Sequence, residues 1–364
     1  MEPASLLGRL TEATGISGHE LEVRGVVRDA WSPFVDAIRE DALGNLIAHR
    51  PGAPGNGSGG TGRSAVDPPP SVLLAGHQDE IGLMVTHVED GGFLRFTTVG
   101  GWDPRVLLAQ PVTVHGAERL PGVVGTRPPH VLGPDTQKST IPVDDMFIDV
   151  GLAADDVRAR VRVGDAVTMR RRTVNLGGDR WAGKAMDNRA SVLAITVALE
   201  ALAVQRHVWD VYAVATAQEE IGLKGAATAA WGIRPTIAVA LDVTFAKQPG
   251  ANEVACKLGG GPVLGFGPNI HPRIYSALCG AADALEMAYQ VEPIAGHSGT
   301  DAWAIQVARG GIPTGLVGIP LRYMHTTVEA VALKDIERAG RLVGQFVAGL
   351  DAAFADGLVE DVGV

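Results

Sequence analysis

The sequence predicts an α/β protein whose chain is interrupted by an inserted β domain. Apolar runs typical of buried strands alternate with segments of helical periodicity in both outer parts of the chain. Between them, short strands alternate apolar and polar residues, which is typical of a small barrel or sandwich. A length of 364 residues suggests about two domains. We expect an α/β domain formed by residues 1–79 and 179–364, and a β domain formed by residues 80–178.

The first α/β part is predicted to contain two helices, two strands and one long loop. Apolar residues recur at helical spacing over 6–10 and 23–30, and residues 45–49 and 71–75 are typical of strands. Residues 51–70 consist mostly of Gly, Pro and Ser, which cannot pack into a core. We therefore expect a flexible surface excursion that enlarges a hairpin loop.

The remaining elements follow in order along the chain. Short strands separated by Gly-Gly, Asp-Pro and Pro-Pro turns are predicted at 85–88, 93–99, 111–115, 122–125 and 163–169, with one helix at 153–161. After Gly183 the α/β rhythm resumes, with helices at 188–205, 271–289 and 333–355 and strands at 208–216, 236–241, 291–295 and 312–319.

Composition excludes several classes of protein. With 46% hydrophobic and 20% charged residues, the chain is not intrinsically disordered. A net charge of −10 without a long basic run argues against nucleic acid or an anionic membrane as the main partner. No uncharged apolar run reaches the roughly 18 residues of a membrane span, and residues 1–12 lack the apolar stretch of a signal peptide. We expect a cytoplasmic protein, with Cys256 and Cys279 as core thiols because they lack CxxC spacing.

Acidic residues and histidines stand where several predicted strands and helices begin or end. Glu219 and Glu220 follow an apolar strand, and adjacent carboxylates repel each other and are costly to desolvate unless a cation neutralises them. The others are His77 and Asp79 after the strand at 71–75, Asp187 at the start of an apolar helix, Asp242 closing a strand, and His325 after the strand at 312–319. Ligands gather outside the carboxyl ends of strands in open α/β sheets. Together these positions indicate a metal site and an enzyme.

Each of these residues also has a structural interpretation on its own. His77 could lie at a surface strand end, with Asp79 on the same face and able to orient the imidazole. Asp187 could simply cap a helix. Asp242 is the exception, because an unpaired charge would be costly in an otherwise apolar strand. The metal-site interpretation therefore depends on their joint occurrence.

Six motifs fall in the order and context of one known family. They are GHQDEIGLMV (76–85), GKAMDNR (183–189), QEEIGLKGA (218–226), ALDVT (240–244), SGTDA (298–302) and MHTTVE (324–329). With them the chain resembles the M42 family of dinuclear metallo-aminopeptidases, the glutamyl and deblocking aminopeptidases, over nearly its whole length. The resemblance implies a zinc-exopeptidase-like three-layer α/β/α catalytic domain with an inserted small β-barrel (PDZ-like) domain.

The resemblance also implies a division of roles among the candidate residues. Asp187 would bridge two divalent ions, one completed by His77 and Asp242, the other by Glu220 and His325. Glu219 would be the unligated general base, which takes a proton from water and returns it to the leaving amine. Asp79 is the second residue expected to take part in catalysis. His and carboxylate ligands without Cys suit zinc, cobalt or manganese, with zinc or cobalt as the first expectation.

We predict a metal-dependent aminopeptidase that removes N-terminal residues from short peptides. The alternatives are a related metal-dependent amidohydrolase or deacylase, and a catalytically silent assembly scaffold, against which the intact Glu219 argues. Lys247 and Gln248 stand where relatives often carry a Gly-Asp pair, which removes a negative charge near the predicted site. This departure bears on substrate preference rather than on catalysis.

The inserted β region is expected to serve oligomerisation, with a lid over the cleft as the alternative. It contributes no candidate ligand; His77 and Asp79 lie just before it in the sequence. Phe93, Phe96 and Trp102 are expected to be exposed apolar residues of the kind that favour partner surfaces. The resemblance implies a homo-oligomer, with dimers built through the insert and a dodecameric cage that admits short peptides.

Overall fold

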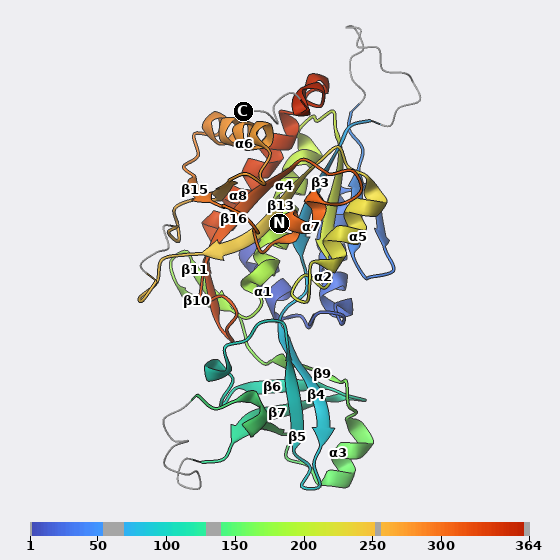
Figure 1. Ribbon diagram of the computed structural model, residues 1–364, viewed down its shortest axis with the longest axis vertical. Helices are drawn as coiled ribbons and strands as arrows, with labels where there is room; N and C mark the ends of the chain where they lie inside the picture. The colour runs from blue at the N-terminus through green and yellow to red at the C-terminus, as the bar shows by residue number, and fades with distance from the viewer. Residues whose placement is uncertain (1, 54–68, 129–139, 252–255, 360–364) are drawn as a thin grey trace.

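The computed structural model describes residues 2–53, 69–128, 140–251 and 256–359. Figure 1 shows an elongated molecule with a large α/β body at one end and a β-barrel at the other. Most of the Gly- and Pro-rich segment 51–70 lies outside the described residues. Among the described helices, none is long and apolar enough to cross a membrane.

Four parallel strands form the centre of the large sheet. They are almost wholly buried, which explains their nearly continuous apolar sequences, because helices cover both faces of the sheet. In spatial order the four strands are β12 (Asp210–Thr216), β3 (Ser71–His77), β13 (Ile237–Phe245) and β16 (Thr314–Arg322). The flanking strands of this 11-stranded sheet are β1 (Ala37–Glu40), β2 (Leu46–Arg50), β17 (Glu329–Ala332), β11 (Arg180–Gly183), β10 (Val174–Gly177), β14 (Val263–Phe266) and β15 (Gln290–Pro293).

Helices cover the two faces of the sheet in separate layers. Along β3, Val72 and Leu74 pack on one side and Leu73 and Ala75 on the other, as the two-residue period of a strand requires. The first side is covered by α1 (Pro3–Glu12), α2 (Leu21–Trp31), α4 (Met186–Val204), α6 (Pro272–Ala284) and α8 (Leu333–Ala348). The second side is covered by α5 (Lys224–Ile233) and α7 (Asp301–Gln306). The predicted three-layer α/β/α arrangement is confirmed.

Two helices end earlier than their periodicity predicts. The helix expected over 271–289 ends at Ala284, because Glu286 adopts a left-handed conformation with φ of 49°. The helix expected over 333–355 ends at Ala348, and Gly349 follows as its cap. Apolar periodicity continues past both ends because these segments still pack against the core.

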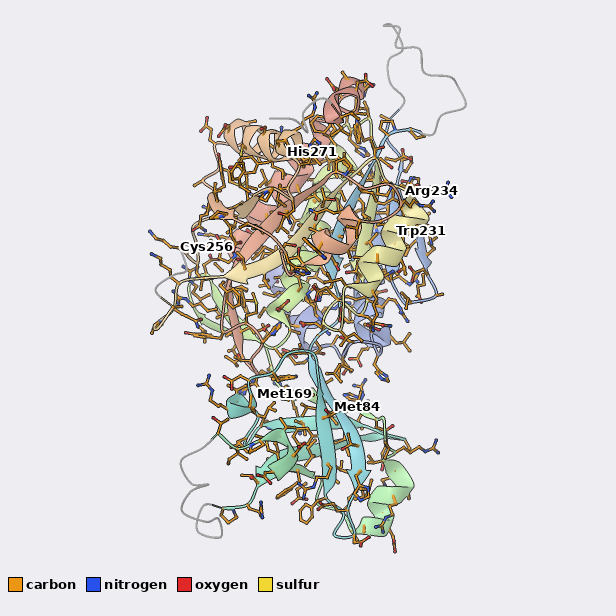
Figure 2. All side chains as sticks on the ribbon, in the orientation of Figure 1. Met84, Met169, Trp231, Arg234, Cys256 and His271 are labelled. Atoms are coloured by element: carbon orange, nitrogen blue, oxygen red, sulfur yellow. The ribbon has the colours of Figure 1, made fainter. Side chains whose placement is uncertain are left out.

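The inserted strands close into a six-stranded barrel rather than a sandwich. Fifteen of its described residues are buried and form a separate apolar core. Figure 2 shows Met84 and Met169 at the barrel end nearest to the α/β body. In order around the barrel the strands are β4 (Gly82–Val88), β5 (Leu94–Val99), β8 (Met146–Asp149), β7 (Arg119–Thr126), β6 (Pro111–His115) and β9 (Ala166–Met169), with the predicted short helix as α3 (Ala154–Arg160).

The aromatic residues expected on the barrel surface are not an exposed patch. Phe96 is 4% exposed and belongs to the barrel core, because it shares the inner face of β5 with Leu94. The Trp102 indole donates a hydrogen bond to the Gly82 carbonyl at 2.9 Å and packs against the same core. Phe93 is half-buried against the edge of Phe147. The prediction of three exposed aromatic side chains was wrong.

Candidate active site

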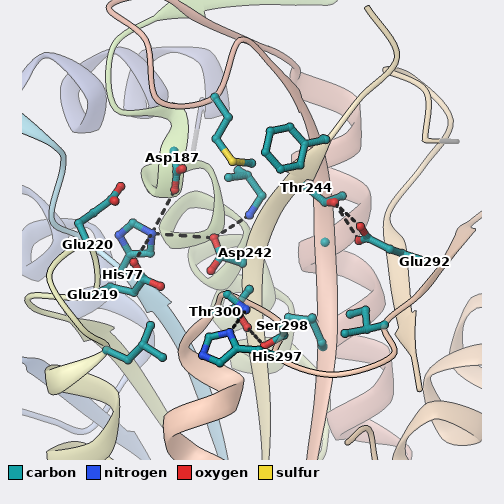
Figure 3. Close-up of a pocket in the computed structure, with 18 of the residues that line it drawn as sticks. His77, Asp187, Glu219, Glu220, Asp242, Thr244, Glu292, His297, Ser298 and Thr300 are labelled. Atoms are coloured by element: carbon teal, nitrogen blue, oxygen red, sulfur yellow. Dashed lines mark hydrogen bonds and ion pairs between the residues drawn. The ribbon is translucent and has the colours of Figure 1, made fainter. Parts of the chain in front are cut away.

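The candidate residues converge at the carboxyl ends of the parallel strands. They come from five segments of the chain. All except Asp187 lie on or after the neighbouring strands β12, β3, β13 and β16, whose carboxyl ends meet at one edge of the sheet, and α4 brings Asp187 to the same edge. We call this group the acidic centre; it lies in a cavity (Figure 3) and consists of His77 at the end of β3, Asp187 in the first turn of α4, Glu219 and Glu220 after β12, Asp242 in β13 and His325 after β16.

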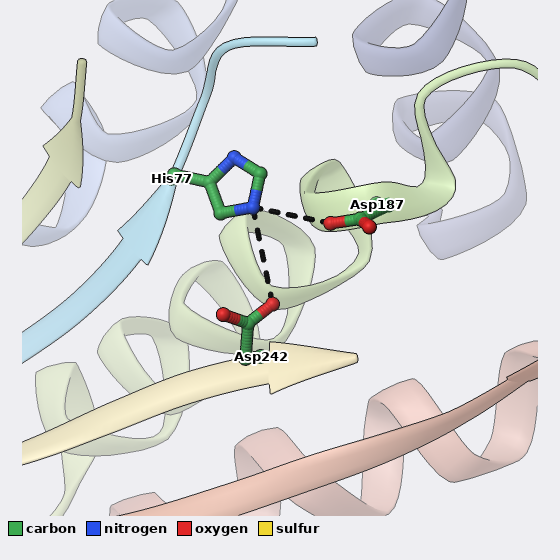
Figure 4. Close-up of side chains that lie close together, drawn as sticks. All are labelled: His77, Asp187 and Asp242. Atoms are coloured by element: carbon green, nitrogen blue, oxygen red, sulfur yellow. Dashed lines mark hydrogen bonds and ion pairs between the residues drawn. The ribbon is translucent and has the colours of Figure 1, made fainter. Parts of the chain in front are cut away.

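His77 faces three carboxylates of the acidic centre. Its Nε2 atom lies 3.1 Å from Asp187 Oδ1, 3.8 Å from Glu219 Oε2 and 3.9 Å from Asp242 Oδ1. Figure 4 shows Asp187 and Asp242 facing the same nitrogen of the imidazole, Asp187 from α4 and Asp242 from β13. The His77 side chain is 2% exposed, so these charges interact with little screening by water.

Asp187 connects this group to a second one. While its Oδ1 atom faces His77, its Oδ2 atom lies 3.5 Å from Nε2 of His325, and that nitrogen lies 3.4 Å from Glu220 Oε2. Two sets of potential ligand atoms, each within 4.8 Å of one another, therefore share one carboxylate. The sets are His77, Asp187 and Asp242, and Asp187, Glu220 and His325. A third set of the same compactness, which does not include Asp187, is His77, Glu219 and Glu220.

The described lining of the acidic centre supplies no Lys or Arg to compensate its carboxylates. Burial raises the pKa of Glu219 to about 9 and the pKa values of Glu220 and Asp242 well above their ordinary ranges, and nearby carboxylates add to the effect. Although burial itself opposes its protonation, Glu219 and Asp187 raise the pKa of His77. Among the described residues that line the cavity, none is Lys or Arg.

One buried oxygen in the acidic centre has no hydrogen-bond partner among the described residues. This atom, Oε1 of Glu220, would be costly to bury unsatisfied. A cation would satisfy it and would relieve the repulsion between the carboxylates. The donor set of imidazoles and carboxylates therefore fits a divalent metal ion.

Asp79 lies beside the acidic centre but belongs to neither ligand set. Its carboxylate accepts hydrogen bonds from Ser17 Oγ at 2.6 Å and from the main-chain N–H groups of Glu219 at 3.1 Å and Glu220 at 3.2 Å. Its Oδ1 atom is 3.5 Å from Nδ1 of His77. Burial opposes ionisation, but the contacts with His77 and Ser17 lower the pKa of Asp79. Asp79 thus fixes both the Glu219–Glu220 turn and the imidazole.

Glu329 has a comparable supporting position that the sequence analysis missed. Its buried carboxylate accepts the main-chain N–H groups of Asp187 and His325, each at 3.0 Å. It therefore holds two candidate ligands from different segments. The available signal was an acid next to an apolar strand, since Glu329 opens β17.

A second group of buried charges lies close by in the sequence. Glu80 accepts hydrogen bonds from Lys184 Nζ at 2.7 Å to both oxygens and from Arg189 Nη2 at 3.1 Å. Burial lowers the pKa of Lys184 to about 8. We call Glu80, Lys184 and Arg189 the Glu80 cluster. Its charges are compensated within the protein, and the sequence analysis gave it no role.

Lys247 and Gln248 lie outside the described lining of the cavity. Gln248 Oε1 accepts the main-chain N–H of Tyr323 at 3.1 Å, and the Lys247 carbonyl accepts from Arg322 Nε at 2.7 Å. These contacts support the turn that leads to His325.

A comparison with models of known protein families shows which family the chain belongs to. The family model for M42 glutamyl aminopeptidase matches residues 61–342. The chain belongs to the M42 family. It is therefore a hydrolase of the aminopeptidase class, and the predicted family, fold class and enzyme class are confirmed.

Individual relatives cover almost the full chain. A lysyl aminopeptidase of Pyrococcus furiosus is 36% identical over 344 residues, which span 93% of this chain and 94% of that protein. The crystal structure of a TET aminopeptidase from a marine sediment thaumarchaeon has a TM-score of 0.87 at 32% identity, covering 98% of this chain and 99% of its own. A TET peptidase of Pyrococcus horikoshii, with a TM-score of 0.81 and 29% identity over 96% of this chain and 100% of its own, can assemble into a tetrahedron or a large octahedral shell.

Proposed function

We propose that this M42 aminopeptidase releases N-terminal residues from short peptides at a centre of two divalent metal ions. The observation that carries the proposal is the position of Asp187, whose two carboxylate oxygens face two different histidines. A carboxylate in that position suits a bridge between two ions. His77 and Asp242 would complete one ligand set, and Glu220 and His325 the other.

Zinc or cobalt is the metal we expect, with manganese as the next candidate, because the ligands are imidazoles and carboxylates. Two bound ions supply an activated water and a polarised scissile carbonyl. The protein's own contribution is to hold the ligands rigidly, through buried strand ends and through the hydrogen bonds of Glu329 and Asp79.

Glu219 is the residue we propose as general base. The two ligand sets that share Asp187 do not include Glu219. We therefore assign its carboxylate to accept a proton from the attacking water and return it to the leaving amine, rather than to the third possible set with His77 and Glu220. Its main-chain N–H is held by Asp79, which fixes the turn on which it lies. Asp79 is then a positioning residue, which acts through Glu219, Glu220 and His77.

A panel of substrates tests the proposal against its alternatives. We expect release of aniline from aminoacyl-anilides and of N-terminal residues from short peptides, and loss of both in the presence of a chelator. Hydrolysis of N-acylated substrates with no action on free N-termini would indicate a deacylase instead. A protein that binds metal but hydrolyses none of these would be a silent scaffold.

We also propose that the chain forms a homo-oligomer through its barrel, as dimers that combine into a cage. The support is the full-length likeness to a peptidase that assembles into closed shells. Light scattering should give a mass several times that of the 37.9 kDa chain. Excision of residues 84–174 should reduce that mass, whereas a fully active monomer would contradict the assembly.

A further inference from the structure

The cavity that contains the acidic centre extends to a further carboxylate, Glu292 on β15. Figure 3 shows Glu292 and Thr244 on the side of the cavity away from His77. Both oxygens of Glu292 lie within hydrogen-bond distance of Thr244 Oγ1, at 2.9 and 2.8 Å. Thr244 is two residues beyond Asp242 on β13 and so lies on the same face of the strand. The strand that carries Asp242 thus also carries the hydroxyl that contacts Glu292.

The described lining of the cavity around Glu292 contains apolar surface but no Lys or Arg. Among the described residues, no Lys or Arg forms an ion pair with Glu292, and none lines the cavity. The walls of the same cavity include the apolar side chains of Ile294, Leu316 and Met324. A half-buried carboxylate on an apolar wall suits a ligand group with a long apolar stem and a cationic end.

We propose that Glu292 makes this enzyme prefer peptides whose N-terminal residue is Lys or Arg. The inference rests on the proposed aminopeptidase function and adds the substrate class. The methylene groups of such a side chain would lie against the apolar walls while its charged end reaches Glu292. An N-terminal Asp or Glu would instead meet a like charge, which disfavours binding.

We expect loss of the Glu292 charge to change the preference among substrates and to leave the rate of the chemical step unchanged. A hydrogen bond to a charged group corresponds to a discrimination of roughly 10- to 100-fold. Glu292→Gln keeps the shape of the side chain and removes its charge. We expect kcat/KM for lysyl- and arginyl-anilide to fall by that factor, mainly through KM, while leucyl-anilide changes by less than about threefold.

Two further variants make the test specific. Glu286→Gln removes an exposed carboxylate just after α6, outside the cavity lining, and should leave every substrate unchanged. Thr244→Val removes the hydroxyl that orients Glu292 and should lower the Lys-to-Leu ratio in the same direction but by less. An unchanged Lys-to-Leu ratio in Glu292→Gln would overturn the proposal. An equal loss for all substrates would also overturn it, because Glu292 would then bind the α-amine common to all.

A binding measurement separates this inference from the proposed function. The thermal shift of the metal-loaded protein with L-lysinamide and with L-leucinamide requires no hydrolysis. A lysinamide preference that disappears in Glu292→Gln supports the pocket assignment even if no anilide is cleaved. Active hydrolysis together with no lysinamide preference rejects the pocket assignment and leaves the aminopeptidase function intact.

Discussion

The acidic centre and the Glu80 cluster are both buried and charged, but they are neutralised differently. The Glu80 carboxylate is matched by Lys184 and Arg189, so its charge is compensated by the fold itself. The acidic centre gathers four carboxylates around two histidines and has no Lys or Arg among its described lining residues. Buried carboxylates without cations are destabilising unless something from outside neutralises them.

The two groups therefore serve different purposes although they stand close together in the sequence. Asp79 and Glu80 are neighbours, yet Asp79 supports the acidic centre and Glu80 ties α4 to the chain that follows α1. The contrast supports our proposal that the acidic centre serves metal binding and chemistry, whereas the Glu80 cluster serves folding. Substitutions in the two groups should accordingly change different measured quantities.

The largest effect is expected for Glu219→Gln. Loss of a general base typically lowers kcat by on the order of 10²–10⁴-fold. Both ligand sets remain complete in this variant, so the bound metal and the melting temperature should stay close to those of the unchanged protein. Glu220→Gln is the matched comparison, since it should also lose metal. Near-normal kcat in Glu219→Gln with full metal content would show that another group takes the proton.

A large loss of stability is expected for Glu80→Gln. Removing one partner of a buried ion pair typically costs about 3–5 kcal/mol, because Lys184 is left with an uncompensated charge. Denaturant titration should detect this as a lower midpoint. The exposed pair of Glu118 and Arg160 provides the control, since Glu118→Gln should cost less than about 1 kcal/mol. An equal loss of unfolding free energy in Glu80→Gln and Glu118→Gln would contradict a stabilising role for the buried Glu80 cluster.

Metal removal should make stability depend on pH in a defined direction. Without a cation, burial raises the folded-state pKa of Glu219 from its ordinary value of 4.5 to about 9. The folded state then binds more protons than the unfolded state, so stability falls as pH rises through this interval. Melting temperatures of chelated protein should fall more between pH 6 and pH 8 than those of metal-loaded protein. Saturation with metal at about 1,000 times its Kd should add about 4 kcal/mol.

The smallest measured change is expected for His325→Ala. It is also the change that best reports the number of bound metal ions. Its ion would retain only Glu220 and the shared Asp187, so bound metal should fall from about two ions per chain towards one. Elemental analysis after gel filtration measures this ratio. The exposed His87→Ala variant on the barrel is the control. Two tightly retained ions in His325→Ala would contradict the assignment of His325 as a ligand.

The sequence allowed the α/β layers and the acidic centre to be predicted because both depend on local patterns. Apolar runs mark the central strands, and an acid or histidine that interrupts such a run at its end marks the edge where ligands gather. The six residues of the acidic centre are brought together as expected. Their separate roles as ligands and base remain predictions.

Features that depend on packing between distant segments could not be predicted. Glu80 is recognisable as a buried ion-pair partner only when Lys184, just before α4, and Arg189, on α4, reach it from more than 100 positions along the chain. Glu292 was missed for the same reason, because its neighbour Thr244 belongs to a different motif. Phe96 was misplaced because closure of the barrel, rather than local composition, decides which face of β5 is inside.

The chain passes from the catalytic sheet into the barrel over a connection of only four residues. β3 ends at His77 and β4 begins at Gly82, and the residues between them are buried and anchored. An engineer who wished to exchange the barrel for another module could not place the junction anywhere in this connection without disturbing the histidine. A replacement module should therefore be joined at Gly82, and residues 78–81 should be kept with the catalytic domain.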